Sequence, residues 1–143
     1  PGIEMPKHWF DFAEDWRSAP MAYWVHVPRD GMHWRDQAAV FDPPAPPGMP
    51  RGYPVLRIEL RDALLWFSSP AQLQAFIETL SMKPLPSSRR LSGQRGSGHG
   101  PNSHWLSRLP AWMKGAGFRE KTLPRIARLA SEVVEGDRWK LPR

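Results

Sequence analysis

The sequence predicts an α+β fold, in which a small antiparallel sheet of three to four strands has helices packed on one face. Two apolar segments, 53–60 and 63–67, are separated by two polar residues, which is typical of a β-hairpin. Helix-start signals stand at Ser69 and at Thr122. Eight tryptophans in 143 residues supply large apolar side chains, which favours one packed core and a single domain over 1–143.

Residues 1–54 are predicted to form three elements and a loop. Four apolar residues at helical spacing predict a first helix that ends before Pro20, and they are Trp9, Phe12, Ala13 and Trp16. Aromatic and β-branched residues predict a strand over Met21–Val27, and a weaker strand is predicted over 33–41. Six prolines within 42–54 predict a surface loop, for which a connector is favoured over a ligand for an aromatic groove.

The hairpin and the helix after it carry the clearest signals. The strand 53–60 has a fully apolar face, which predicts that this face packs on helices, and a tight turn at 61–62 leads into the strand 63–67. Ser69 is a predicted N-cap, Pro70 suits the first helical position and Gln72 is placed for a capping box. The apolar stripe of this helix consists of Leu73, Phe76, Ile77 and Leu80.

The second half begins with a change in composition. Residues 83–103 are rich in Gly, Ser and Arg and contain no acid, which predicts a long basic loop. Apolar residues return over 104–114, where Pro110 predicts two short helical turns that end at Gly115. A last helix is predicted over Thr122–Glu135, capped by Thr122, with an apolar face of Leu123, Ile126, Ala127, Ala130 and Val134.

Charge is distributed unevenly along the chain. The net formal charge is +6, but residues 1–82 carry 7 Lys/Arg and 10 Asp/Glu, a balance of −3. Residues 83–131 carry 10 Lys/Arg and one acid, a balance of +9, and residues 132–143 are balanced. A near-neutral α+β segment, residues 1–82, is therefore followed by the basic loop 83–103 and by a basic helical segment, residues 104–143. Crowded like charges are unfavourable unless a partner of opposite charge relieves them.

The charge distribution favours a non-enzymatic binding protein whose cationic second half engages nucleic acid or another polyanion. Arginine matches phosphate with a planar fork of donors, and tryptophans such as Trp105 and Trp112 can stack on bases if they are exposed. The residues predicted to contact phosphates are Arg89, Arg90, Arg95, Arg108, Lys114, Arg119, Lys121 and Arg125.

Two other classes of function stay open. The same arginines and tryptophans would suit a protein–protein interaction module, an inhibitor or an assembly factor, that binds an acidic partner. An enzyme is less favoured, and it would need His99 or His104 to meet a distant carboxylate in a cleft.

Several chemistries find no support in the sequence. The chain has no cysteine, which excludes disulfides, cysteine-based zinc sites and thiol nucleophiles. No G-x-S-x-G or G-x-G-x-x-G pattern occurs, and the histidines lack metal-ligand spacing. We therefore predict no catalytic residue, no metal and no cofactor. The apolar segments are too short to cross a membrane, and no signal segment begins the sequence.

The segment 100–110, GPNSHWLSRLP, resembles a segment in uncharacterised small proteins of bacterial mobile elements and accessory gene pools. The resemblance covers about a dozen residues, and more loosely the hairpin and the helix after it. It implies a bacterial, cytoplasmic context and brings no activity, cofactor or catalytic residue with it.

Overall fold

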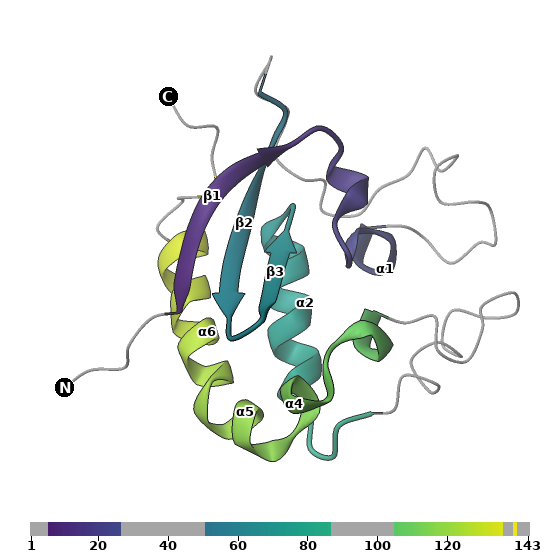
Figure 1. The fold of residues 1–143 in the computed structure, drawn as a ribbon, viewed down its shortest axis with the longest axis vertical. Helices are drawn as coiled ribbons and strands as arrows, with labels where there is room; N and C mark the ends of the chain where they lie inside the picture. Colours follow the sequence, from purple (N-terminus) through teal and green to yellow (C-terminus); the bar gives the residue numbers. More distant parts are fainter. Residues whose placement is uncertain (1–5, 27–50, 87–104, 136–138, 140–143) are drawn as a thin grey trace, which may run out of the picture.

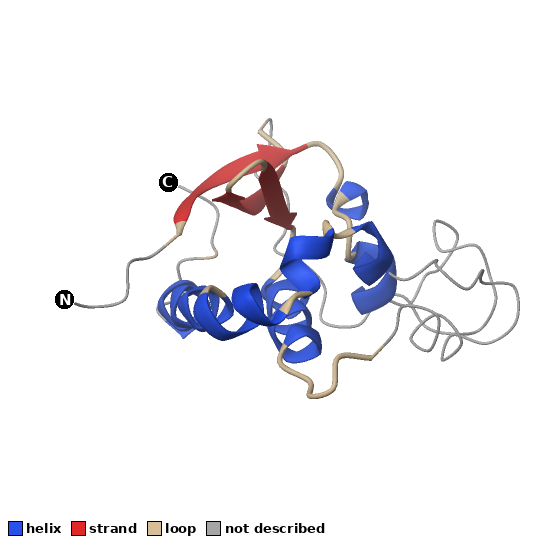
Figure 2. Cartoon of the chain, turned by 60° about the horizontal axis from the view of Figure 1, so that its bottom comes forward, coloured by secondary structure: helices blue, strands red, loops and turns tan. Residues whose placement is uncertain are grey.

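The computed structural model describes residues 6–26, 51–86, 105–135 and 139, and it confirms the α+β class. Its sheet has three antiparallel strands in the order β1-β2-β3, which span Lys7–Ala13, Tyr53–Leu60 and Ala63–Phe67. Figure 1 shows the sheet lying over α2 (Pro70–Leu80) and α6 (Leu123–Ala130). Figure 2 shows these helices on one side of the sheet, as predicted.

The β2–β3 hairpin is confirmed at both strands and at its turn. Leu60 lies opposite Ala63, so Arg61 and Asp62 form a two-residue turn, in which Arg61 has a φ of 52°. Such turns require positive φ, which costs a non-glycine residue free energy. Leu56 and Ile58 are fully buried against the helices, because alternate residues of β2 face the core.

The first predicted helix is wrong, because Lys7–Ala13 is the edge strand β1, paired antiparallel to β2. Trp9, Phe12, Ala13 and Trp16 do have helical spacing, but the same segment also alternates. Phe10 lies opposite the buried Leu56 and packs against the core, whereas Trp9 lies opposite Arg57. Alternation and pairing with β2 therefore override the helical spacing.

The residue directly before β2 must be a glycine, because it lies against the end of β1. Gly52 has a φ of 103°, and a side chain there would collide with the backbone carbonyl of Ala13. Only glycine adopts such a conformation without strain, and only glycine leaves room for the close approach of the β1 backbone.

The predicted strand Met21–Val27 is also wrong, because the short helix α1 spans Ala22–His26. A 3₁₀ turn, η1 (Trp16–Ser18), precedes it. Met21, Ala22 and His26 are buried at helical spacing, and Ala22 packs with Trp16 in a small second cluster. Tertiary contacts therefore outweigh the β-propensity of this segment.

A buried polar network anchors α1 to the start of α2. The Ser69 hydroxyl caps α2 by accepting from the Gln72 backbone N–H at 3.3 Å, and it lies 2.6 Å from His26 Nε2. The predicted capping box is only half formed, because the Gln72 side chain bonds to the Ser68 backbone N–H and hydroxyl instead. Ser68 in turn donates to the Trp16 carbonyl at 2.9 Å. Each buried polar side chain of this network is thus hydrogen-bonded.

The second half is helical. η3 (Trp105–Arg108) and α4 (Ala111–Lys114) confirm the two short turns on either side of Pro110. The sequence did not predict α5 (Ala116–Lys121), which runs directly into α6 and a final π-turn, η4 (Ser131–Glu135). Because α5 precedes it directly, Thr122 is helical and makes no side-chain cap.

The apolar face of the last helix differs from the prediction at its buried residues: Leu129, which was not predicted to face the core, is fully buried. Val133 is fully buried, whereas Val134 is 41% exposed. The structure joins residues of both halves in one core, from Leu56 in β2 to Val133 in η4. The predicted strand 33–41, most of the proline loop 42–54 and most of the basic loop 83–103 lie outside the described residues.

Candidate nucleic-acid interface

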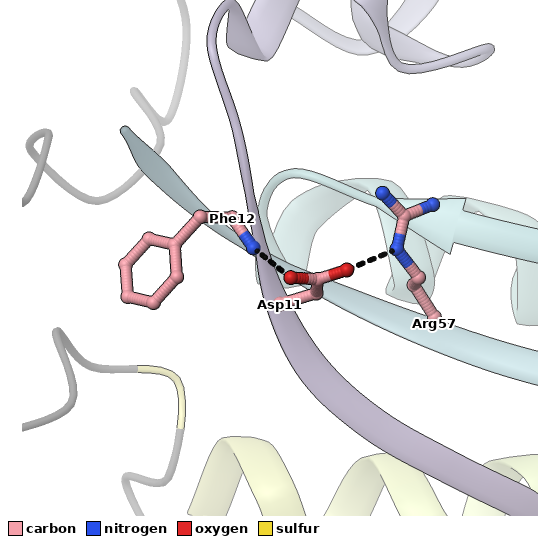
Figure 3. Close-up of polar contacts among 3 residues, drawn as sticks. All are labelled: Asp11, Phe12 and Arg57. Carbon is pink, nitrogen blue, oxygen red and sulfur yellow. Dashed lines mark hydrogen bonds and ion pairs between the residues drawn. The ribbon is translucent and has the colours of Figure 1, made fainter. Parts of the chain in front are cut away.

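The charged side chains of the sheet are paired with one another. Lys7 lies 3.4 Å from Glu59, its direct partner across β1 and β2. Arg57 Nε donates to Asp11 at 3.1 Å, and the other Asp11 carboxylate oxygen accepts from the Phe12 backbone N–H at 2.8 Å (Figure 3). The acids of β1 and β2 thus have cations of the same sheet as partners.

The cations of the helical second half are arranged differently. Arg108, Lys121 and Arg125 are exposed, and Lys114 is half-buried. Within the described ranges, none of them forms an ion pair with a carboxylate. The described acids of the first half therefore do not neutralise these four cations.

Most of the described cations of the second half lie around α5, at the end of the molecule that holds the β2–β3 turn and α4 (Figure 1). We call this region the α5 surface. Two acids, Asp62 and Glu120, belong to the same elements. Its cations come from the hairpin turn, the segment after α2, and the helices α4, α5 and α6; they are Arg61, Lys83, Lys114, Arg119, Lys121 and Arg125.

Two hollows flank α5, and each is lined by two cations. One, of about 570 Å³, separates α5 and α6 from the end of α2 and is lined by Lys83, Arg119 and the acid Glu120. The other, of about 390 Å³, is lined by Arg61 and Lys121. Helix α5 is therefore a ridge with a pair of cations on either side.

The smaller hollow has an aromatic wall. The Arg61 guanidinium lies 4.7 Å from the centre of the Trp112 ring, which also packs edge-on against Phe118 at 5.6 Å. Gly117 lines this hollow and has open space where a side chain would be. The ring of Trp112 holds the Arg61 side chain in place, since cation–π contacts favour one position of the guanidinium.

Arg119 differs from the other cations of the α5 surface. Its Nε donates to the Leu80 carbonyl at 2.9 Å, and its Nη2 donates to the Met82 carbonyl. Both carbonyls lie at the end of α2, where helical carbonyls lack partners of their own and a positive charge is favourable. Arg119 therefore ties α5 to α2.

The predicted site residues are only partly brought together. Lys114, Arg119, Lys121 and Arg125 lie on the α5 surface, whereas Arg108 lines a separate hollow beside β3. Arg89, Arg90 and Arg95 lie outside the described residues. Trp105 cannot stack on a base, because it is 3% exposed and stacks on Phe76 within the core.

Sequence reasoning missed two cations of the α5 surface and one buried pair. Arg61 belongs to the near-neutral half and joins the basic residues only through the fold, and Lys83 was counted in the basic stretch but not chosen. The His26–Ser69 pair has the atoms of a nucleophile and its base, but both side chains are at most 1% exposed. No substrate could reach them, so the pair is structural.

Other chemistries gain no support within the described residues. No three metal-ligating side chains converge there, and none of the helices among them is long and apolar enough to cross a membrane. His99 and His104, the candidates for an enzymatic role, lie outside the described ranges. Comparison of the chain with known protein families, with curated proteins and with solved structures finds no match.

Proposed function

We propose that the protein binds nucleic acid through the α5 surface, without marked sequence preference. One observation carries the proposal: six cations lie on α5 or on the elements next to it, and apart from Arg119 none has a hydrogen-bond or ion-pair partner among the described residues. Lysine and arginine on a protein surface attract the phosphate backbone by charge and by release of its counterions. Such contacts give affinity and position the nucleic acid, but they do not read its sequence.

The two hollows suggest how the phosphates are held. Arg61 and Lys121 would bind one phosphate group on one side of α5, and Lys83 would bind another across the ridge. Lys114 and Arg125 extend the charged area over α4 and α6. Arg119 serves as a positioning residue, because two of its donors are already used by carbonyls of the α2 terminus.

Charge reversal at three helical cations tests this proposal. The variant K114E/K121E/R125E is compared with K7E/R17E/R51E, which changes the net charge equally but lies outside the α5 surface. Binding of labelled 20-nucleotide RNA, and of single- and double-stranded DNA, is measured by fluorescence anisotropy in 50 mM salt. The helical variant should bind on the order of a hundredfold more weakly. Circular dichroism checks that both variants fold.

Two results would contradict the proposal. If no nucleic acid binds the unaltered protein at low salt, the α5 surface has another role. If both triple variants lose affinity equally, only net charge matters. The alternative function is an interaction module that binds an acidic protein, and labelled polyglutamate serves as its probe. If the protein binds polyglutamate but no nucleic acid, the interaction module is favoured. The bacterial and mobile-element context stays a prediction from the resemblance of residues 100–110.

A further inference from the structure

The free edge of β3 lies beside an apolar hollow that the proposed function does not use. In the described sheet, β3 pairs only with β2 and so forms one edge (Figure 1). Leu60 and Ala63 flank the two-residue turn, which makes them a hydrogen-bonded pair. The backbone groups of Leu64 and Trp66 therefore point away from β2. Within the described ranges, no other backbone segment bonds to them.

A hollow of about 410 Å³ runs along this edge. All five residues of β3 line it, those that face the helices and those that face away, so it follows the strand rather than one face of the sheet. Its opposite walls come from the turn before α1, which includes Met21, and from η3 with the residues after it, which include Leu109. Leu64 is 49% exposed beside it.

Most of the residues that line the hollow are apolar, and one of them is charged. Arg108 is the only charged residue among those that line it, is exposed, and has no ion-pair partner in the described ranges. An open edge with apolar walls is a template for an added strand, since backbone hydrogen bonds give affinity and alternate side chains fill the pockets. The single cation adds a preference for a carboxylate.

We propose that this edge binds an extended peptide segment of a partner protein, with apolar side chains at alternate positions and an acidic residue facing Arg108. A second copy of this chain fits less well. Its own β3, ALLWF, is apolar but contains no carboxylate to face Arg108. The proposal does not depend on nucleic-acid binding, because it uses none of the residues of the α5 surface.

Two ten-residue peptides serve as probes. Both alternate valine with threonine, and they carry glutamate or lysine at both ends. The unaltered full chain should bind the glutamate peptide about fivefold more tightly than the lysine peptide, and Arg108→Glu should invert this preference. If Arg108 served only in folding, Arg108→Glu would weaken the binding of both peptides equally. The K114E/K121E/R125E variant should bind the peptides as the unaltered protein does.

A pair of variants at Leu64 tests the backbone pairing. Leu64→Pro removes the outward N–H, and proline is tolerated on the free side of an edge strand. Leu64→Ala removes most of the side chain but keeps the N–H. Leu64→Pro should lose at least tenfold in peptide affinity relative to Leu64→Ala. Equal affinities, the absence of saturable binding, or an unaltered preference in Arg108→Glu would each overturn the proposal. So would a dimer of the unaltered protein that Leu64→Pro converts to a monomer, because a second copy would then occupy the edge.

Discussion

The sheet and the α5 surface use their charges in different ways. On the sheet, Lys7 faces Glu59 and Arg57 bonds to Asp11 across neighbouring strands. On the α5 surface, Lys114, Lys121 and Arg125 have no carboxylate partner among the described residues. Opposite charges across two strands help to fix their register, whereas a group of like charges repels itself. The charges of the sheet are therefore paired within the fold, whereas we propose that those of the α5 surface bind a partner of opposite charge.

The largest expected effect on stability is a difference between alanine substitutions at two glycines, Gly52 and Gly117. Gly52→Ala should lower the free energy of unfolding by about 2–4 kcal/mol, because its φ of 103° and the Ala13 carbonyl leave no place for a side chain. Gly117→Ala, in α5, should raise it by up to about 1 kcal/mol, since a helical glycine is unfavourable and open space surrounds this one. Urea unfolding measures both. Equal effects at the two sites would contradict the requirement for glycine at position 52.

Arg119 is the one cation of the α5 surface with hydrogen-bond partners among the described residues. Arg119→Ala should lower the free energy of unfolding by about 2 kcal/mol, because the carbonyls of Leu80 and Met82 lose a charged donor. The control is Lys121→Ala on the same helix, with an expected change below about 0.5 kcal/mol. Chemical denaturation compares them. A loss of stability at Lys121 as large as at Arg119 would show that the cations of α5 are structural as a group.

The ion pairs of the sheet should contribute little. A double-mutant cycle on Asp11→Ala and Arg57→Ala should give a coupling energy of about 0.5 kcal/mol, because the two side chains are 53% and 23% exposed. The coupling should fall in 0.5 M salt, as exposed charges are screened. Thermal and urea unfolding give the free energies of unfolding of the unaltered protein, the two single variants and the double variant. A coupling energy near zero at low salt would show that this ion pair of the sheet does not stabilise the fold, so that the sheet and the α5 surface would not differ in this respect.

The smallest expected effect is a gain in stability. Lys121→Gln with Arg125→Gln should raise the free energy of unfolding by a few tenths of a kcal/mol at low salt, because like charges are removed from neighbouring turns. High salt should abolish the gain. A clear loss of stability at low salt would indicate that these cations have stabilising partners in the folded chain.

Local signals predicted the middle of the fold well and its beginning badly. The hairpin 53–67 and the helix from Ser69 follow from alternation and capping, which act over a few residues. Trp9 and Phe12 satisfied a helical spacing, yet pairing with β2 decided that segment. Likewise, α1 is held by a contact with a residue distant in sequence, since His26 hydrogen-bonds to Ser69. Such long-range contacts cannot be read from one segment.

The candidate site shows the same limit. Composition located the basic half, but it could not separate Arg119, which is engaged by the end of α2, from Lys121, which is exposed. Nor could it bring Arg61 from the hairpin turn to Trp112. The open edge of β3 depends on strand order, which hydrophobic patterning does not specify.

The salt dependence of binding to duplex DNA tests the central claim most directly. For the unaltered protein, the logarithm of the association constant should fall linearly with the logarithm of salt concentration. In K114Q/K121Q/R125Q, this slope should be shallower by about two to three, because each phosphate contact contributes about 0.9. An unchanged slope in this variant would contradict the assignment of the α5 surface as the nucleic-acid interface.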